Sequence, residues 1–376
     1  MSQEQIRRRR SKLAFLMSAG TIGIILLVVS TYQLVEFTDS TAFCGELCHD
    51  VMEPEYVAHQ NSPHSRVTCA GCHVGSGAGY LVKSKISGIP LIIATIFNIY
   101  PRPIPTPVVN LRPARETCEQ CHRPERFAGD LVRVHISYGL DEANTEKVDI
   151  RVMRVGGGAE KVAKDIHWHV AAKVWYVASD SKRQEIEWVG IDTAGLPLVE
   201  YVDPRKTTPI STKTINEEKR LMDCMDCHNR ATHIFSSPEQ LIDEAIARAK
   251  IDRSLPFIKR EGLSALNPPS PTLEQAGARI ASIRDFYRNS YPKVFQEKSG
   301  AITKALQELN EISRLTNFPV MKANWASYFD NAGHLDTPGC LRCHGKLVAK
   351  GGATAGKTIN AACDSCHYFD LKQVLK

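Results

Sequence analysis

Little of the charge in this sequence is available for binding a polyanion. The 376 residues carry a formal net charge of +6, yet residues 1–12 alone hold five basic side chains and one acidic side chain. The rest of the chain therefore has a net charge of only +2, too small to suggest a nucleic-acid-binding surface. The sequence also lacks a phosphate-binding glycine loop and any repeat longer than a cysteine motif. It therefore gives no sign of a nucleotide-binding or solenoid protein.

Charged residues are missing from residues 13–35, and these 23 residues are enough to cross a bilayer as a helix. Four arginines, Arg7–Arg10, precede the run, and the positive-inside rule then places residues 1–12 in the cytoplasm. A cleavable signal peptide is the alternative, but the run is long for one and no A-x-A-like cleavage site follows it. We therefore expect an uncleaved, single-pass anchor in the cytoplasmic membrane, with the bulk of the chain, from Glu36 onward, in the periplasm.

No cysteine stands outside a pair. The twelve cysteines form six close pairs, and a histidine follows the second cysteine of every pair. Disulfides are formed outside the cytoplasm, but disulfides, zinc sites built from two separated pairs and single thioredoxin-like motifs all leave the histidines unexplained. In C-x-x-C-H, both cysteines form thioethers to a haem and the histidine ligates its iron. The sequence therefore predicts six covalent haem c sites, which are Cys44 and Cys48 with His49, Cys69 and Cys72 with His73, Cys118 and Cys121 with His122, Cys224 and Cys227 with His228, Cys340 and Cys343 with His344, and Cys363 and Cys366 with His367.

Each low-spin haem also needs a second axial ligand. Seven of the 13 histidines lie outside the motifs, which is close to the number that six bis-histidine haems would use. His167 and His169 lie in "DIHWHVAAKVWYVAS", which we predict to be a strand with both imidazoles on one face. His233 lies too near its own motif to reach across that haem, so we expect it to bind a neighbouring one. For His59, ligation and a role in solvent or at a substrate site are equally open. The predicted distal ligands are His64, His135, His167, His169, His233 and His334.

The pattern along the chain predicts a haem-packed multihaem cytochrome with little regular structure near the haems. Residues 36–128 form a membrane-proximal domain with three motifs, in which porphyrin would replace most of the core. Residues 129–235 contain a small β-rich insertion and the fourth site, residues 236–332 have the spacing of a helical scaffold, and residues 333–376 hold two further sites. The apolar run at residues 87–107 is predicted to lie in the membrane interface, with a buried helix as the alternative.

The N-terminal third of the chain resembles a known family. A basic tail and one anchor are followed by "FCGELCHDVMEPEY", "SPH", "CAGCH" and "YLVKSKISG". This combination resembles the NapC/NirT family of membrane-anchored, quinol-oxidising cytochromes c over residues 7–125, and the later motifs resemble its longer, six- or seven-haem members. The resemblance implies that the chain moves electrons from menaquinol or ubiquinol through its haems to a periplasmic redox partner.

The first motif differs from the other five, because three residues separate Cys44 from Cys48. In the family that the sequence resembles, a methionine shortly after this motif can ligate the iron. The matching residue here is Met52. The resemblance therefore implies His49, Met52 or both as ligands of the first haem, which suits a site where electrons enter.

The resemblance also implies a quinol site made of a lysine and an acidic residue after the second motif. Lys83 and Lys85 match the lysine, but residues 74–115 contain no aspartate or glutamate. The proton acceptor is then expected among the nearest candidates in sequence. These are Glu53, Glu55 and His59.

Two other functions are compatible with the same residues. A passive electron-relay subunit of a larger membrane redox complex needs no quinol site, and the missing acid favours it. A terminal reductase needs an iron with an open position, which the supply of histidines disfavours.

Overall fold

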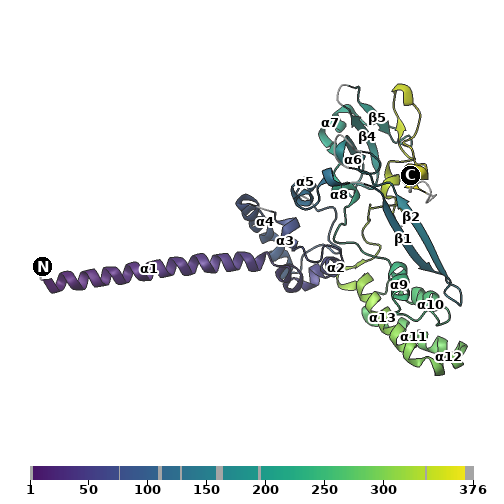
Figure 1. The fold of residues 1–376 in the computed structure, drawn as a ribbon. Helices are drawn as coiled ribbons and strands as arrows, with labels where there is room; N and C mark the ends of the chain where they lie inside the picture. The colour runs from purple at the N-terminus through teal and green to yellow at the C-terminus, as the bar shows by residue number, and fades with distance from the viewer. Residues whose placement is uncertain are drawn as a thin grey trace. The chain divides into compact units, whose positions relative to one another are not determined.

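The computed structural model describes residues 3–75, 77–108, 112–127, 129–157, 164–193, 196–334 and 337–368 (Figure 1). The chain divides into two compact units. The first comprises the residues up to 53 together with residues 66–97, and the second comprises residues 54–65 together with those from 98 onward.

Two apolar helices dominate the first unit. Helix α1, Gln3–Thr38, buries no side chain and contains a window of mean hydropathy 2.3. Helix α4, Ala78–Ile96, contains a window of mean hydropathy 1.2. Within the described residues, these two alone are long and apolar enough to cross a membrane. The helix predicted over residues 13–35 is confirmed. The apolar run predicted from residue 87 belongs to a helix that begins earlier, so length alone no longer distinguishes an interfacial helix from a spanning one.

Short helices carry the cysteine motifs of this unit. Phe43–Leu47 forms a π-helical turn, α2 runs over His49–Gln60 and continues into the second unit, and α3 is Cys69–His73. The Thr68 side chain caps α3 by accepting a hydrogen bond from the Gly71 backbone N–H.

A helical scaffold fills residues 238–316 of the second unit, as the sequence predicts. Ser237 and Gln240 cap its first helix reciprocally, each side chain accepting a hydrogen bond from the other's backbone N–H. Its core holds fully buried isoleucine and leucine side chains, including Ile242, Ile280 and Leu309. The helices are α9 (Pro238–Ala247), α10 (Ile258–Leu266), α11 (Leu273–Ser290), α12 (Pro292–Glu297) and α13 (Ser299–Thr316).

The predicted β-rich insertion is a five-stranded antiparallel sheet in the order β6-β3-β4-β5-β9. Its last strand comes from beyond the fifth motif and pairs with β5, which ties that motif to the sheet. Val174, Val189 and Leu347 form part of the core beside it. The strands are β3 (Lys173–Ala178), β4 (Ile186–Asp192), β5 (Val199–Val202), β6 (Arg220–Leu221) and β9 (Val348–Ala349).

A long hairpin reaches from the C-terminal motif to the helical scaffold (Figure 1). It consists of β1, Leu131–Tyr138, and β2, Glu146–Met153, and β10, His367–Tyr368, pairs with the far end of β2. At the other end, the Tyr138 backbone N–H donates to Asp243 of α9 over 3.0 Å. The remaining short elements are α5 (Ala114–Thr117), α6 (Trp168–Ala171), α7 (Thr212–Glu218), α8 (Cys224–Cys227), β7 (Asn317–Phe318) and β8 (Ala323–Asn324).

The strand predicted across His167 and His169 is wrong. His167 has φ −76° and ψ −2°, and His169 lies inside the single helical turn α6. The turn is closed by backbone hydrogen bonds from Trp168 to Asp165 and from Val170 to His167, at 3.2 and 3.1 Å. Alternation over so few residues fits a turn as well as a strand, and these local hydrogen bonds decide for the turn. Strand β3 starts only at Lys173.

Candidate haem sites

The cysteine motifs share a local geometry that needs little regular structure. In the third, fourth and fifth motifs, the backbone N–H of the histidine donates to the carbonyl of the first cysteine over 2.7–3.1 Å. Each of these motifs is one helical turn, which places the two cysteines and the histidine close together. None of the twelve cysteines forms a disulfide in the part of the chain that the structure describes. The motifs therefore present the two thiols and one imidazole that covalent haem attachment requires.

The second cysteines of the second and third motifs, Cys72 and Cys121, differ in their surroundings. Cys72 is half-buried within the short helix α3. Cys121 is exposed and follows the 3₁₀ turn Cys118–Gln120, where its backbone N–H donates to the Cys118 carbonyl over 3.2 Å. A thioether needs only a sulfur within reach of a haem vinyl group, so the exposure of Cys121 is compatible with attachment. Haem attachment at Cys72 and Cys121 stays a prediction.

The extra residue of the first motif is absorbed by the π-helical turn Phe43–Leu47. A π-turn accommodates one more residue than an α-turn, and such turns are frequent at functional sites. The helical hydrogen bonds continue after this turn, since Met52 N–H still donates to the Cys48 carbonyl over 3.0 Å. The side chain of His49 lies outside the described residues.

Four pairs of histidine rings lie at a separation that an iron atom would span. A metal–imidazole bond is about 2.0 Å long, and a C–N bond of about 1.33 Å gives a five-membered ring a radius of about 1.1 Å. Two such bonds and two radii put the centroids of a bis-histidine pair about 6.3 Å apart. The measured centroid separations are His59–His233 6.3 Å, His64–His122 5.9 Å, His169–His344 5.8 Å and His334–His367 6.1 Å.

Hydrogen bonds fix the tautomer of three of these rings. The Nδ1 atom lies 2.9 Å from the Ile166 carbonyl in His169 and 2.5 Å from the Asn360 carbonyl in His344. In His233 it lies 3.0 Å from the Glu55 carbonyl. A carbonyl can only accept, so Nδ1 must carry the proton and Nε2 keeps its lone pair. This is the arrangement found in metal-ligating histidines. The three pairs that contain a motif histidine, His64–His122, His169–His344 and His334–His367, therefore fit haem iron. The pair His59–His233 contains no motif histidine.

His167 is the neighbour of the fourth motif. Burial lowers the pKa of His167, and the nearby imidazole of His228 lowers it further. The His167 ring also packs on Phe127, with the ring centroids 4.8 Å apart. His167 therefore lies close to the motif histidine of the fourth site.

The last four motifs follow one another in space in their sequence order. Burial and the neighbouring His122 imidazole lower the pKa of His228, which links the third motif to the fourth. Burial and the Cys340 thiol raise the pKa of Cys227, which links the fourth to the fifth. The same two influences raise the pKa of Cys366 in the sixth motif. The third to sixth sites thus form a continuous series within the second unit.

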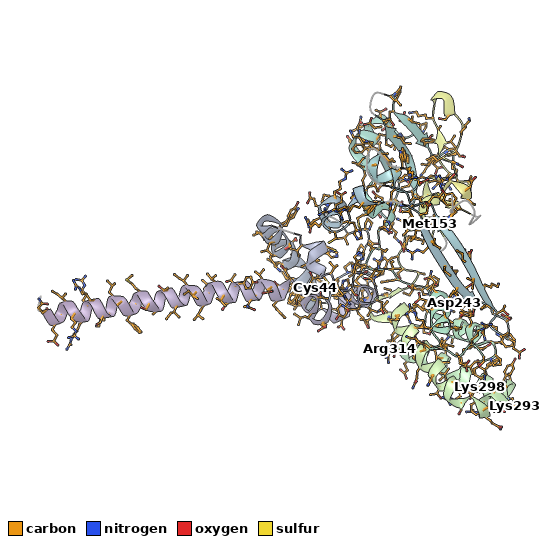
Figure 2. The ribbon with its side chains drawn as sticks, in the orientation of Figure 1. Cys44, Met153, Asp243, Lys293, Lys298 and Arg314 are labelled. Atoms are coloured by element: carbon orange, nitrogen blue, oxygen red, sulfur yellow. The ribbon has the colours of Figure 1, made fainter. Side chains whose placement is uncertain are left out.

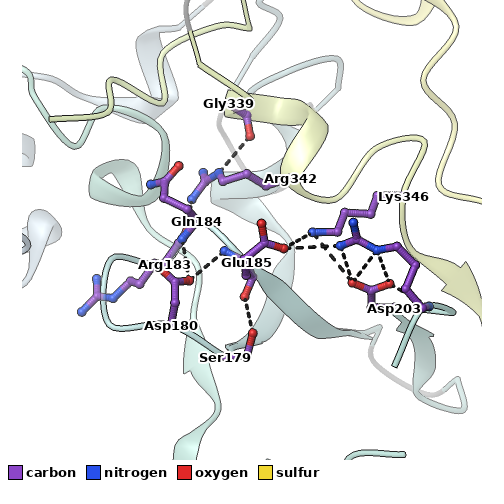
Figure 3. A network of polar contacts seen from close by, with 10 residues as sticks. Ser179, Asp180, Arg183, Gln184, Glu185, Asp203, Gly339, Arg342 and Lys346 are labelled. Atoms are coloured by element: carbon purple, nitrogen blue, oxygen red, sulfur yellow. Dashed lines mark hydrogen bonds and ion pairs between the residues drawn. The ribbon is translucent and has the colours of Figure 1, made fainter. Parts of the chain in front are cut away.

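Polar side chains hold the fifth motif against the sheet, as Figure 3 shows, and a further contact holds it against the fourth motif. Lys346 Nζ lies 2.6 Å from Glu185 and 3.8 Å from the buried Asp203 carboxylate. Arg342, one of the two residues between the motif cysteines, donates to the backbone carbonyl of Asp226 over 2.7 Å. Asp226 lies between the cysteines of the fourth motif. The spacing of these two sites is therefore set by direct contact between their motifs.

The predicted ligands are not all placed in the same way. His135 is exposed on β1 and lies opposite Asp149 in the antiparallel register. Among the described residues, no histidine ring contact involves it. His59, in contrast, is only 4% exposed and faces His233.

The predicted quinol-site residues fall into separate environments. Lys83 and Glu53 are exposed on α4 and α2. The Glu55 side chain is only 12% exposed and pairs with Arg230, with an N–O distance of 3.1 Å. Burial raises the pKa of Glu55, and the Arg230 guanidinium opposes that rise. Glu55 is therefore committed to an ion pair within the second unit.

Lys85 makes a contact that the sequence did not suggest. Its ammonium pairs with the carboxylate of Asp39 and donates to the Thr38 hydroxyl over 2.8 Å. Asp39 directly follows the last residue of α1. A hydrogen bond to Cys69 raises the pKa of the Cys44 thiol, and burial and the Asp39 carboxylate raise it further. The pair thus lies next to the first motif. The sequence pointed to Glu53, Glu55 and His59 as the proton acceptor and not to Asp39, although the end of an anchor is equally close to the membrane.

Comparison with known proteins gives two matches. Residues 6–102 match the family described as NapC/NirT cytochrome c family, N-terminal region. The cytochrome c-type protein ImcH of Geobacter sulfurreducens is 42% identical over 362 residues, which are 96% of this chain and 70% of that protein. None of the solved structures matches the chain significantly.

Proposed function

Given that the chain belongs to the NapC/NirT family of cytochromes c, an electron-transfer family that is membrane-anchored and carries covalent haem c, we propose that it oxidises quinol in the cytoplasmic membrane. Electrons would then pass through six haems c to a periplasmic redox partner. The haems supply one-electron carriers, and the protein supplies the ligands, the quinol site and the anchor α1.

The observation that carries the proposal is the ion pair between Lys85 and Asp39 beside Cys44. Quinol oxidation releases two protons with two electrons, so a base must lie near the electron-accepting site. Asp39 supplies a carboxylate for this purpose at the end of α1. The Lys85 ammonium has three donors, of which those not used by Asp39 and Thr38 can hydrogen-bond to a quinol oxygen. Both side chains are about one quarter to one third exposed, which leaves room for a substrate to approach.

The histidine pairs support an assignment of axial ligands. We assign His64 to the third haem, His169 to the fifth and His334 to the sixth, each facing the histidine of that motif. His167, which lies near His228, is assigned to the fourth. This leaves two spare histidines, His59 and His233, which face each other. By count, these two remain as candidates for a further distal ligand, and Met52 remains for the first motif. His135 is then not required.

The proposal is tested by mixing the purified full-length protein, in detergent or liposomes, with a reduced menaquinol analogue. The haem α-band reports electron arrival. Asp39→Asn and Lys85→Met are expected to slow this reduction by about 10²-fold, the usual contribution of a positioned acid or base. Dithionite should reduce both variants at the wild-type rate. The remote variant Lys293→Met, on exposed α12, serves as the control.

Failure of wild-type protein to accept electrons from quinol, with the first haem intact, would overturn the quinol site. The chain would then be a passive relay subunit that takes electrons from another membrane protein. A stable membrane redox partner in a native pull-down would support that alternative.

A further inference from the structure

Two residues on one face of helix α2 contact the same histidine, His233. Glu55 and His59 are four residues apart, so their side chains project from the same side of the helix one turn apart. The His59 ring lies 6.3 Å from that of His233, with an interplanar angle of 39°. The Nδ1 atom of His233 lies 3.0 Å from the Glu55 carbonyl and 3.2 Å from a Glu55 carboxylate oxygen. Helix α2 therefore contacts His233 twice. His59 faces the His233 ring, and Glu55 accepts the hydrogen bond from its Nδ1 atom.

Arg230 holds both members of this contact. Its guanidinium donates to the Glu55 carboxylate over 3.1–3.4 Å, and its Nε donates to the His233 carbonyl over 2.6 Å. The guanidinium packs on two neighbouring aromatic rings, 4.7 Å from the centroid of Phe235 and 4.5 Å from that of Tyr328. Arg230 is 7% exposed. Hydrogen bonds and ring packing together therefore restrain its position.

We propose that Glu55 and Arg230 are positioning residues that orient the His233 imidazole and set the reduction potential of the haem it ligates. This role goes beyond electron transfer as such and differs from the proton-acceptor role considered for Glu55 from the sequence. It rests on the proposed function, in which His233 is one of the two spare histidines available to ligate a haem. A net gain in stability does not account for the cluster, because buried ion pairs seldom stabilise relative to apolar residues. A fixed imidazole does account for it.

The chemistry gives the direction of the effect. The Nδ1 proton of His233 is donated to the Glu55 backbone carbonyl, and the negative charge of the Glu55 carboxylate 3.2 Å from the same nitrogen makes the opposite ring nitrogen a more basic ligand. A more basic ligand favours ferric over ferrous iron. Replacing the carboxylate by an amide keeps the shape and weakens this preference, so the potential of that haem must rise.

The test uses full-length, haem-loaded protein and chemical mediators. Midpoint potentials come from an optically monitored titration, and the ligand field comes from electron paramagnetic resonance of the ferric protein. In Glu55→Gln, we expect one of the haems to lose about tenfold of its ferric preference, as typical outer-sphere changes do. For a one-electron couple this is a rise of about 59 mV. The haem-to-protein ratio should not change. Glu274→Gln, the same substitution at an exposed site on α11, should shift no potential.

A second variant covers a failure of Glu55→Gln to fold, which would leave a buried guanidinium unpaired. Glu55→Gln/Arg230→Gln removes both charges and should show the same rise. Unchanged potentials and resonance signals in fully loaded variants would overturn the inference. Wild-type protein without bis-histidine signals would overturn the ligand assignment and this inference with it. Because mediators supply the electrons, failure of quinol oxidation alone would leave the result intact.

Discussion

Lys259 offers a test of how the helical scaffold is joined to the rest of the second unit. It is 2% exposed on α10, and its ammonium lies 2.9 Å from the buried Asp243 carboxylate and 2.7 Å from the Tyr138 carbonyl. Figure 2 shows Asp243 where the helices meet the hairpin. Lys259→Met removes the ammonium and keeps most of the side-chain volume. Asp243 is left as a buried carboxylate with the Tyr138 backbone N–H as a donor.

The magnitude follows from burial. Removing one partner of a buried ion pair costs about 3–5 kcal/mol, because the other charge stays desolvated. At 1.4 kcal/mol for each factor of ten, the opening of α9 and α10 should become about 10²- to 4 × 10³-fold more frequent. Hydrogen–deuterium exchange of peptides from these helices, in the full-length protein, measures this opening directly.

The pH dependence gives a second check with a definite sign. Burial raises the pKa of the Asp243 carboxyl, and Lys259 opposes that rise. In the variant the lowering influence of Lys259 is lost and only the hydrogen bond from the Tyr138 backbone N–H still opposes burial, so the pKa of Asp243 rises and the folded state holds a proton more readily than in wild type. The penalty is therefore complete at neutral pH and shrinks as the pH falls toward the ordinary aspartate value of about 3.9.

Lys293→Met is the matched control. Lys293 lies at the far end of the scaffold, is 86% exposed, and pairs with Glu297 at 4.0 Å (Figure 2). Such exposed pairs contribute about 0.5 kcal/mol or less, so exchange should change by less than about threefold. Wild-type exchange in Lys259→Met, or equal changes in both variants, would refute the reasoning.

Three further predictions concern the sites themselves. His169→Ala should leave one haem with an open position, seen as carbon monoxide binding to one reduced haem, whereas His135→Ala should not; the reverse result would contradict the ligand assignment. Met52→Leu should alter the spectrum or potential of a single haem, and an unchanged titration would remove Met52 from the ligands. Arg205 lowers the pKa of Asp203 to about 2 by hydrogen bonds, so the stability this gives is complete above about pH 3.9 and is lost as the pH falls toward 2. Circular dichroism of the haem bands should show this loss of stability between about pH 3.9 and about 2 in wild type, whereas Asp203→Asn, which has no carboxylate there, should not show it.

Features that depend on local spacing could be predicted from the sequence. The cysteine motifs, the charge-free anchor segment and the helices around Pro238–Ala247 and Ser299–Thr316 depend only on residues close in the chain. The antiparallel strands of the β-rich insertion are also of this kind. The strand predicted across His167–His169 from alternating residue types was wrong, because two periods of such a pattern are too few to separate a turn from a strand.

Contacts between distant segments could not be predicted in the same way. His169 and His344 lie 175 residues apart in sequence and are brought together by packing of the sheet against the C-terminal segment. A count of spare histidines sets how many ligands are available, but it cannot say which two meet. Cys121 is exposed and Cys72 is half-buried although both follow the C-x-x-C-H spacing, so this difference is likewise set by packing. The pairing of Asp39 with Lys85 was missed for the same reason, because one residue ends α1 and the other lies on α4.

The structure suggests a reason why the long helices and strands lie outside the motifs, which consist of single short turns. Covalent attachment fixes each haem to one helical turn, so the motif itself needs little support. Direct contacts such as that of Arg342 with the Asp226 carbonyl then hold one turn against the next. The distal imidazole has no covalent link, and its position depends on the element that carries it. Helix α2, which presents Glu55 and His59 to His233, illustrates this division. A substitution in an element that carries a distal histidine should therefore displace that axial ligand from its haem iron before it reduces covalent haem attachment.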